Sequence, residues 1–490
     1  MHYKTYEAII GLEIHAQLLT ESKMFCGCPV KFGSLPNSNT CPVCLGLPGV
    51  LPVLNKKAIE FAIKMGLATN CEIALSSIFA RKNYFYPDLP KGYQISQYDH
   101  PLCHNGWIEI NSDGTTKRIT IRRIHLEEDA GKSVHDENYV DEYSTFIDLN
   151  RCGIPLIEIV SEPEINTPRE AVSFLTQTRK ILQYLGICDG NMEEGSLRCD
   201  ANLSIRPKGS KALGTKTEVK NMNSFRNVEH ALQHEIKRQI AIIEKGGDVD
   251  QATLLWDADL NEVREMRSKE ESHDYRYFPE PDLVPLKLDE KLVEEIKSKL
   301  PELPYQRKNR IITQYNIPEY DCEILTSSKN LADYFEEVVN QIDDPKMVSN
   351  WIMTEVMRVL NEKKIDIIDL SVTPQNVAEL LFLIKNETIN LNSAKHVFQE
   401  MIETQEEPGQ IIARLELTQI SKEGELATIV QDVLEKNPDE VQSYKEGKKK
   451  IFGFFMGQVM RATQGKANPQ LVKEILQQKL TGQDDTSSKT

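Results

Sequence analysis

The sequence predicts an α+β protein in which an antiparallel-sheet domain comes first and helical domains follow. Residues 12–18 and 197–206 alternate between apolar and polar side chains, the period of a strand with one buried face. From about residue 290, segments of helical length and periodicity follow one another at 288–300, 328–342, 345–361, 374–387 and 392–404. A chain of 490 residues is too long for one core. We therefore expect three domains, covering residues 1–290, 291–407 and 408–490.

The composition is typical of a soluble globular protein, with 40% hydrophobic and 27% charged residues. Residues 1–7 lack the apolar core of a signal peptide, and no apolar run has the length of a membrane span, so a cytoplasmic location is expected. The net charge of −16 argues against a general nucleic-acid coat. Residues 441–480 nevertheless hold eight basic and two acidic residues, a local charge of +6.

The first predicted strand places an acid and an imidazole side by side. Its apolar face is Leu12, Ile14, Ala16 and Leu18, and its polar face is Glu13, His15 and Gln17. An ordinary solvated sheet face would show the same pattern, so this strand alone does not identify a site.

Four of the ten cysteines lie within a short Pro- and Gly-rich segment, as Cys26, Cys28, Cys41 and Cys44. Two close pairs separated by a loop can bring four thiolates to the corners of a tetrahedron around Zn²⁺. Four free thiols are the alternative, but this clustering favours zinc. Because four sulfur ligands leave no open position, such a site would be structural.

Three consecutive acids, Glu127, Glu128 and Asp129, precede Gly131-Lys132-Ser133. Adjacent carboxylates repel one another, so a folded chain places them near cations or hydrogen-bond donors. A phosphate-binding loop would need a glycine where this chain has Leu126. The P-loop interpretation therefore fails, and the acids need another explanation.

Further acids fall on predicted strands. Glu158 stands inside the apolar segment 155–163, where an unpaired carboxylate would be costly. Segments 197–206 and 215–220 carry acids interleaved with Arg and Lys. Such mixed charges on several strands favour a sheet with a functional polar face.

Oxygen-rich side chains with one imidazole are typical of a site for Mg²⁺ or Mn²⁺, and Mg²⁺ commonly arrives with a nucleotide. The candidate ligands are Glu13, His15, Glu127, Glu128 and Glu158, with Glu193 or Glu194 as a further one. The candidate phosphate-binding residues are Lys82, Lys132, Lys216 and Lys220. Phosphoryl transfer needs mainly a metal and positive charge held in line. The residues leave two alternatives open, a nucleotide-dependent enzyme and an RNA-binding scaffold.

The segment 81–94 is rich in aromatic, basic and turn-forming residues. It is suited to contact a nucleotide or an RNA 3′ end by stacking and charge. Tyrosines in loops also commonly cover the edge of a core, so the segment does not decide between these roles.

Several long motifs together resemble the GatB/GatE family, the B subunits of the Glu-tRNA(Gln)/Asp-tRNA(Asn) amidotransferase GatCAB. The resemblance covers nearly the whole chain. It rests on the segments Ile10–His15, Arg81–Asp88, Arg123–Lys132, Pro155–Pro163, Met192–Asn202 and Asp274–Pro281. The C-terminal pattern Gly457–Arg461 and Gly465–Pro469 also matches, while Phe454 and Phe455 depart from an aliphatic tendency there.

The resemblance implies a cradle domain that binds ATP, Mg²⁺ and the charged tRNA 3′ end, followed by a helical domain and an all-α YqeY-like tail that hold the tRNA body. It implies phosphorylation of the side-chain carboxylate of a misacylated tRNA and its replacement by an amide. The matching motifs carry Glu13, His15, Glu127 and Glu158 onto the metal role and catalysis. Glu128 is the alternative to Glu127, which is favoured because it would share a strand face with His125.

The resemblance further implies that the four cysteines form a zinc knuckle, which some family members lack. No Ser-rich amidase signature occurs in this sequence. Ammonia is therefore expected from a GatA-like glutaminase subunit, with a GatC-like subunit completing a heterotrimer that acts on tRNA(Gln), tRNA(Asn) or both. The alternative is a non-catalytic subunit that presents tRNA, with the acids in structural roles.

Overall fold

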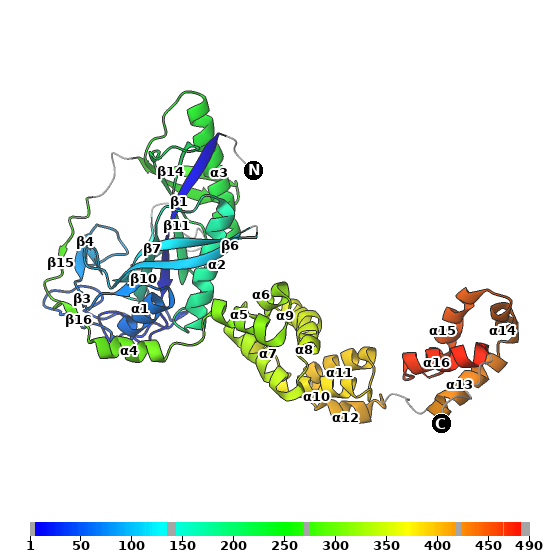
Figure 1. The fold of residues 1–490 in the computed structure, drawn as a ribbon. Helices are drawn as coiled ribbons and strands as arrows, with labels where there is room; N and C mark the ends of the chain where they lie inside the picture. Colours follow the sequence, from blue (N-terminus) through cyan, green and yellow to red (C-terminus); the bar gives the residue numbers. More distant parts are fainter. Residues whose placement is uncertain are drawn as a thin grey trace. The chain divides into compact units, whose positions relative to one another are not determined.

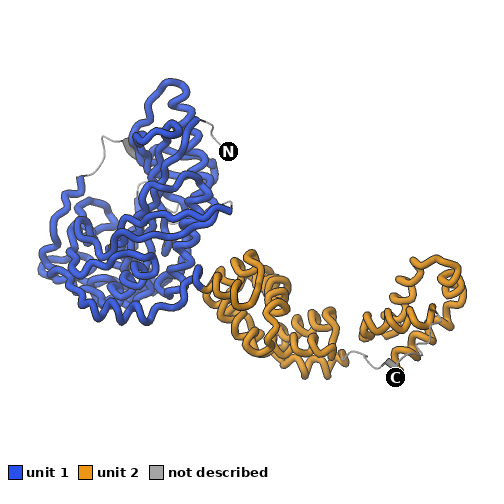
Figure 2. The backbone as a smooth tube through the Cα atoms, viewed as in Figure 1, with its two compact units in different colours: residues 1–306 blue, residues 307–490 orange. Residues whose placement is uncertain are grey.

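The computed structural model describes residues 5–112, 114–134, 144–268, 274–417, 423–463 and 465–481. They form two compact units, residues 1–306 and 307–490 (Figure 2). Each unit has its own apolar core. In the part of the chain that the structure describes, helices are too short or too polar to cross a membrane.

The first unit is built on a nine-stranded sheet with the order β14-β13-β12-β11-β1-β10-β7-β6-β2 (Figure 1). Neighbouring strands are antiparallel except for the parallel pair β12 and β13, so the predicted antiparallel sheet is in detail a mixed one. The strands are β1 Tyr6–Gln17, β2 Glu72–Ile73, β6 Cys103–Ser112, β7 Thr115–Glu128, β10 Pro155–Ser161, β11 Leu197–Pro207, β12 Thr217–Lys220, β13 Ala252–Asp257 and β14 Glu262–Ser268.

Strand β1 lies in the middle of this sheet, between β10 and β11. Its alternation is the predicted one, because Leu12, Ile14 and Ala16 are fully buried whereas Glu13 and His15 are half-buried. Since every second residue of a strand faces the same side, the central strands bury one face and present a polar one.

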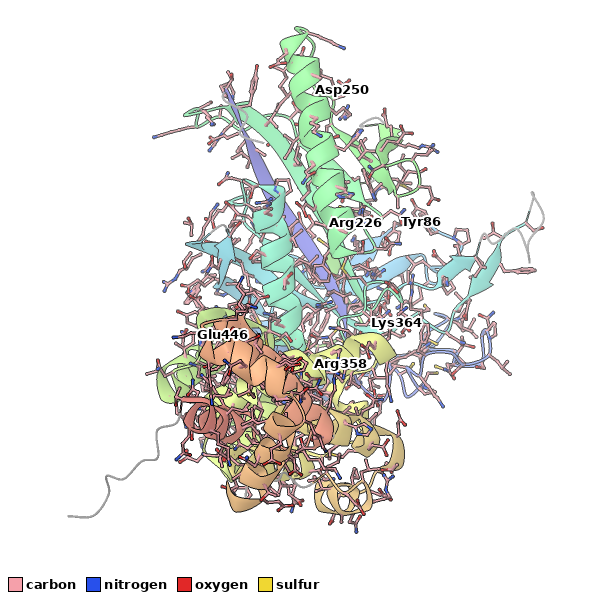
Figure 3. All side chains as sticks on the ribbon, turned by 90° about the vertical axis from the view of Figure 1, so that its right-hand side faces the viewer. Tyr86, Arg226, Asp250, Arg358, Lys364 and Glu446 are labelled. Atoms are coloured by element: carbon pink, nitrogen blue, oxygen red, sulfur yellow. The ribbon has the colours of Figure 1, made fainter. Side chains whose placement is uncertain are left out.

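The helices α1 Lys56–Ala68, α2 Pro168–Tyr184 and α3 Phe225–Glu244 cover the apolar face of the sheet, and α4 Glu290–Ser298 packs against α1. All four contribute to one core. The helices α2 and α3 begin at capping residues, since the side chains of Thr167 and Ser224 each accept a hydrogen bond from a backbone N–H of the first turn. Figure 3 shows Arg226 in the first turn of α3 and Asp250 beyond its last turn.

Three small sheets extend the first unit. The strand β4 Ala80–Asn83 pairs with β5 Tyr93–Ser96 and β15 Phe278–Pro279, and the other pairs are β3 Ser76–Ser77 with β16 Leu286–Lys287 and β8 Lys132–Val134 with β9 Phe146–Asp148. Arg81 fixes the segment 274–280, called the late segment below, to β4. Its Nε and Nη2 donate to the two carboxylate oxygens of Glu280 at 2.7 and 2.9 Å. Residues 274–279 are thereby held beside the loop 81–94.

The second unit is helical, as predicted. Its core elements are α5 Pro304–Tyr315, α6 Glu319–Leu325, α7 Lys329–Ile342, α8 Pro345–Trp351, a π-helical stretch Ile352–Val356, α9 Met357–Lys363, a 3₁₀ turn Ile367–Asp369, α10 Pro374–Lys385, α11 Leu391–Thr404 and α12 Pro408–Arg414. A separate apolar cluster joins α13 Glu423–Glu435, α15 Phe452–Ala462 and α16 Pro469–Thr481, with α14 Pro438–Lys445 and the 3₁₀ turn Lys449–Ile451 beside them. The helices α5 and α6 were not expected from the sequence pattern.

Each boundary expected from the sequence falls at the start of a helix that packs with the preceding residues. Ile296 of α4 belongs to the core of the sheet unit, although it follows the expected boundary at 290. Ile411 and Ile412 of α12 likewise belong to the helical core, although they follow the boundary at 407. The apolar residues of each helix therefore determine the core in which the helix packs.

Candidate active site

Three neighbouring strands bring the main acids and histidines together on the polar face of the sheet. His15 of β1 lies opposite Glu158 of β10, and Glu158 lies opposite His125 of β7. Directly opposed residues have Cβ atoms about 5 Å apart and point to the same face. The distances from His15 Nε2 to carboxylate oxygens are accordingly 3.4 Å for Glu158 and 3.6 Å for Glu127.

These side chains line a cavity of about 550 Å³. Its walls combine acids, cations and aromatic rings, which include Glu13, His15, Lys82, Tyr84, Arg123, His125, Glu127, Asp129, Glu158, Arg198, Asp200, Glu218, Lys220, Tyr275 and Tyr277. A cavity of this size with convergent groups of both signs is suited to a phosphorylated ligand and a divalent cation.

The ligand atoms of His15, Glu127 and Glu158 all lie within 4.8 Å of one another. Two carboxylates and an imidazole at this spacing fit Mg²⁺ or Mn²⁺. Glu13 lines the same cavity, but its Oε1 accepts a hydrogen bond from Asn202 at 2.9 Å and it lies outside that close group. Glu193 and Glu194 are exposed in a turn and do not line the cavity.

The ionisable side chains of the cavity shift one another's pKa values. Burial opposes a charged imidazole, but Glu158 and Glu127 outweigh it and raise the pKa of His15 to about 9. Burial likewise opposes ionisation of Glu158, yet His125 and His15 hold its pKa well below the usual range. The pKa of Glu13 is raised by burial and by the charge of Glu158.

His125 is a member of this group that the sequence analysis did not name as a candidate. Its side chain is buried, and its Nε2 lies 3.3 Å from Glu158 Oε2. Its Nδ1 is also buried and has no hydrogen-bond partner among the described residues. The signal was present in the sequence, because His125 and Glu127 are two residues apart and therefore share a strand face.

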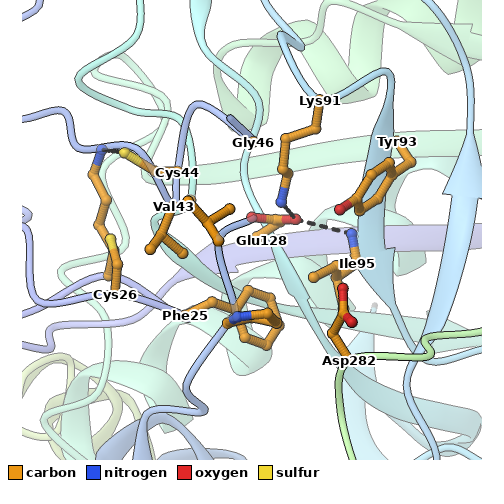
Figure 4. A pocket seen from close by; sticks show the side chains of 14 residues that line it. Phe25, Cys26, Val43, Cys44, Gly46, Lys91, Tyr93, Ile95, Glu128 and Asp282 are labelled. Atoms are coloured by element: carbon orange, nitrogen blue, oxygen red, sulfur yellow. Dashed lines mark hydrogen bonds and ion pairs between the residues drawn. The ribbon is translucent and has the colours of Figure 1, made fainter. Parts of the chain in front are cut away.

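The three consecutive acids occupy three different environments. Glu127 faces the cavity, whereas Glu128 forms a buried ion pair with Lys91 and accepts a hydrogen bond from the Ile95 N–H at 2.9 Å (Figure 4). Asp129 binds Arg198 and Gln17. The sequence-based preference for Glu127 over Glu128 agrees with this placement, and Glu128 has no part in the close group with His15.

Four cysteine sulfurs converge in the loop before α1. The Sγ atoms of Cys26, Cys28, Cys41 and Cys44 lie within 4.8 Å of one another, which fits a tetrahedral metal site. A hydrogen bond from Cys26 lowers the pKa of Cys44 to about 4 despite burial, and Lys23 adds to this effect. The Lys23 Nζ atom lies 3.7 Å from Cys44 Sγ.

The four lysines named from the sequence lie in different places. Lys82 and Lys220 line the cavity, and Lys220 forms ion pairs with Asp200 at 2.9 Å and Glu218 at 3.0 Å. Lys216 lines a second cavity of about 240 Å³ that shares Glu13, and its Nζ donates to Asn202. Lys132 is exposed on the β8–β9 pair and lines neither cavity.

Aromatic side chains form one wall of the cavity. Tyr275 and Tyr277 arrive from the late segment that Arg81 fixes, and they lie edge-on at 6.1 Å between ring centroids. The Lys82 Nζ atom lies 5.0 Å from the centre of the Tyr275 ring, an arrangement in which the ring stabilises the cation. The segment 81–94 therefore contributes both charge and an aromatic ring, Tyr84, to the cavity.

Comparisons with known proteins identify the family that the chain resembles over most of its length. Residues 8–294 match the family model described as the GatB/GatE catalytic domain, and residues 333–480 match the model described as the GatB domain. The B subunit of the aspartyl/glutamyl-tRNA(Asn/Gln) amidotransferase of Thermodesulfovibrio yellowstonii is 57% identical over 471 residues, which cover 96% of this chain and 98% of that protein. The protein of the same name from Chlorobium phaeobacteroides is 55% identical over 478 residues, covering 98% of this chain and 100% of that protein.

Proposed function

This chain belongs to the GatB/GatE family of amidotransferase B subunits, and we propose from that premise that it carries the kinase and transamidase site of a tRNA-dependent amidotransferase. Its substrates would be Glu-tRNA(Gln), Asp-tRNA(Asn) or both, in agreement with the names of its relatives. The observation that supports a catalytic role most strongly is the close group of His15, Glu127 and Glu158 in a cavity that also holds cations.

The first proposed step is phosphorylation of the substrate carboxylate. One carboxylate oxygen of the tRNA-bound glutamate or aspartate attacks the γ-phosphorus of ATP, and the bond from that phosphorus to the β-phosphate oxygen breaks, so ADP leaves with the bonding electrons. The product is an acyl phosphate. This activation is needed because a carboxylate resists attack by ammonia, whereas phosphate is a good leaving group.

In the second proposed step, ammonia attacks the acyl carbon and the bond to phosphate breaks. The nitrogen loses one proton, and the products are the amidated tRNA and phosphate. A GatA-like glutaminase would supply the ammonia, and a GatC-like subunit would complete the heterotrimer. The overall reaction is that of a ligase that forms a carbon–nitrogen bond with glutamine as amido donor.

Within the cavity, His15, Glu127 and Glu158 would hold Mg²⁺, with Glu13 as a further carboxylate at its edge. Mg²⁺ would neutralise phosphate oxygens and orient the reacting groups. Lys82 and Lys220 would supply positive charge to ATP. Structural Zn²⁺ is proposed for the four cysteines, and the basic segment near the C-terminus is proposed to contact tRNA.

The proposal is tested by assembling the complex with its partner subunits and supplying each mischarged tRNA. The unaltered complex should hydrolyse ATP only with mischarged tRNA, and hydroxylamine should trap the acyl phosphate. Glu127→Gln should abolish this hydrolysis while glutaminase activity and tRNA binding stay nearly intact. Unchanged ATP hydrolysis by this variant would instead favour a subunit that only presents tRNA.

A further inference from the structure

A buried aspartate at the end of β7 organises one wall of the cavity. Asp129 is 2% exposed, and its carboxylate accepts hydrogen bonds from Arg198 Nη2 at 3.0 Å and Gln17 Nε2 at 2.8 Å. The contact with Arg198 joins a carboxylate to a guanidinium at 3.0 Å and is therefore a buried ion pair.

The position of Asp129 is fixed through its backbone. Its N–H donates to the Ile154 carbonyl at 2.8 Å, and its own carbonyl accepts from the Gly153 N–H at 2.8 Å. The Nε atom of Arg151 lies 3.5 Å from the second carboxylate oxygen. A carboxylate held from several sides can fix the direction of an arginine that binds it.

Arg198 stands directly beside the proposed cation site. It is the register partner of His15 on the adjacent strand β11, and its side chain lines the cavity. The negative charges of Asp129, Glu127 and Asp200 raise the pKa of Arg198 above its usual value. Among the residues that the structure describes, Arg198 makes a hydrogen bond through Nη2 alone, to Asp129. Within that described part of the chain, its other N–H groups therefore lack protein acceptors at this wall of the cavity.

The candidate lysines are placed differently. Lys220 is neutralised by two carboxylates, and Lys216 donates to an asparagine in the second cavity. Lys82 is a point charge among tyrosine rings. A guanidinium differs from these ammonium groups because its planar N–H groups match two oxygens of one phosphate.

We propose that Arg198 binds the phosphoryl group that moves from ATP to the substrate carboxylate, and that Asp129 is a positioning residue that holds Arg198 for this contact. The inference rests on the proposed function and adds two residues to it. During the transfer, negative charge is spread over the equatorial oxygens of the phosphoryl group. A guanidinium already aimed at these oxygens stabilises that charge without having to reorganise.

Arg198→Met in the assembled complex tests the contact itself. The expected result is a loss of about 10²–10³-fold in the kcat of tRNA-dependent ATP hydrolysis, since a fixed donor to the developing charge is removed. Arg198→Lys should recover only part of it, because an ammonium cannot bind two oxygens in the same way. Binding of a non-hydrolysable ATP analogue should weaken as well. Arg264→Met, at an exposed arginine of the edge strand β14, is the matched control.

Asp129→Asn tests the positioning role. It should lower kcat about tenfold to a hundredfold, because a misplaced group of this kind costs that much. In the Arg198→Met background the same change should have an effect of less than about twofold, since its action passes through Arg198. Merely structural damage would instead multiply the two losses and lower the thermal unfolding temperature of both variants.

The outcomes separate the two proposals. If the unaltered complex does not use ATP with mischarged tRNA, the proposed function fails. If the unaltered complex is active and Arg198→Met keeps its kcat and its nucleotide affinity, the function stands and the inference about Arg198 is wrong. If Arg198→Met loses activity while Asp129→Asn adds an independent loss, the positioning role is wrong.

Discussion

The cavity group and the cysteine group both bring potential metal ligands within 4.8 Å of one another, but the chain builds them in opposite ways. His15, Glu127 and Glu158 come from three strands and meet because the register of the sheet aligns them. The four cysteines come from one loop and meet because that loop folds back on itself. A site made by register stays open on the side facing the cavity, whereas four sulfurs around an ion leave no position for substrate. Equal closeness of ligands therefore does not mean equal function.

The largest difference in Mn²⁺ affinity is expected between variants of the neighbouring residues Glu127 and Glu128. Glu127→Gln should weaken Mn²⁺ binding to the cavity by more than about a hundredfold. Mutation of a residue that only hydrogen-bonds to a metal ligand already lowers metal affinity by about 10–100-fold, and loss of a ligand should cost more. Glu128→Gln should leave Lys91, whose side chain is 4% exposed, without its charge partner and lower the free energy of unfolding by roughly 3 kcal/mol. Electron paramagnetic resonance and thermal unfolding measure the two effects. Equal loss of Mn²⁺ by both variants would contradict the assigned placement.

A smaller effect on activity is expected from the cysteine group. Cys28→Ser should remove stoichiometric zinc and make residues 26–50 sensitive to protease. Few side chains of this loop are buried, so the metal would be its main stabilising interaction. ATP hydrolysis should fall by less than about tenfold, since a closed site binds no substrate. Cys322→Ser, at a buried cysteine of the helical unit, is the control for metal analysis. Loss of all ATP hydrolysis with an intact fold would show that the two groups are not independent.

The smallest effect on either group is expected from removal of residues 418–490. This truncation ends after Leu417, which packs on the helical core, rather than at 408, where it would remove α12 from that core. Mn²⁺ and Zn²⁺ binding should be unchanged. Affinity for tRNA should fall roughly tenfold and become less dependent on salt, because the lysines of 441–480 no longer displace counterions. An unaltered salt dependence would rule out a tail contact with the phosphate backbone.

The sequence predicted the central strands and three of the cavity acids, Glu13, Glu127 and Glu158, because the alternation along a strand is a local signal. The face shared by His125 and Glu127 was enough to prefer Glu127 over its neighbour. The partners of Glu128 and Asp129 could not be predicted, since Lys91 lies in the turn before β5 and Arg198 lies on β11, and only the tertiary fold brings them to these acids. For the same reason the sequence could not show which lysines lie at the cavity. Lys132 and Lys82 appeared equally suitable for binding phosphate, although only Lys82 lines the cavity.

The central position of β1 has a consequence for synthesis of the chain. This strand, Tyr6–Gln17, leaves the ribosome before its neighbours in the sheet, which are residues 155–161 and 197–207. The backbone N–H and C=O groups along both edges of β1 therefore stay unpaired until β10 and β11 have been synthesised. Pairing between strands so far apart in the sequence is also slow. During that interval an apolar strand is exposed to aggregation, so we expect the nascent first unit to depend on chaperones until β11 has emerged.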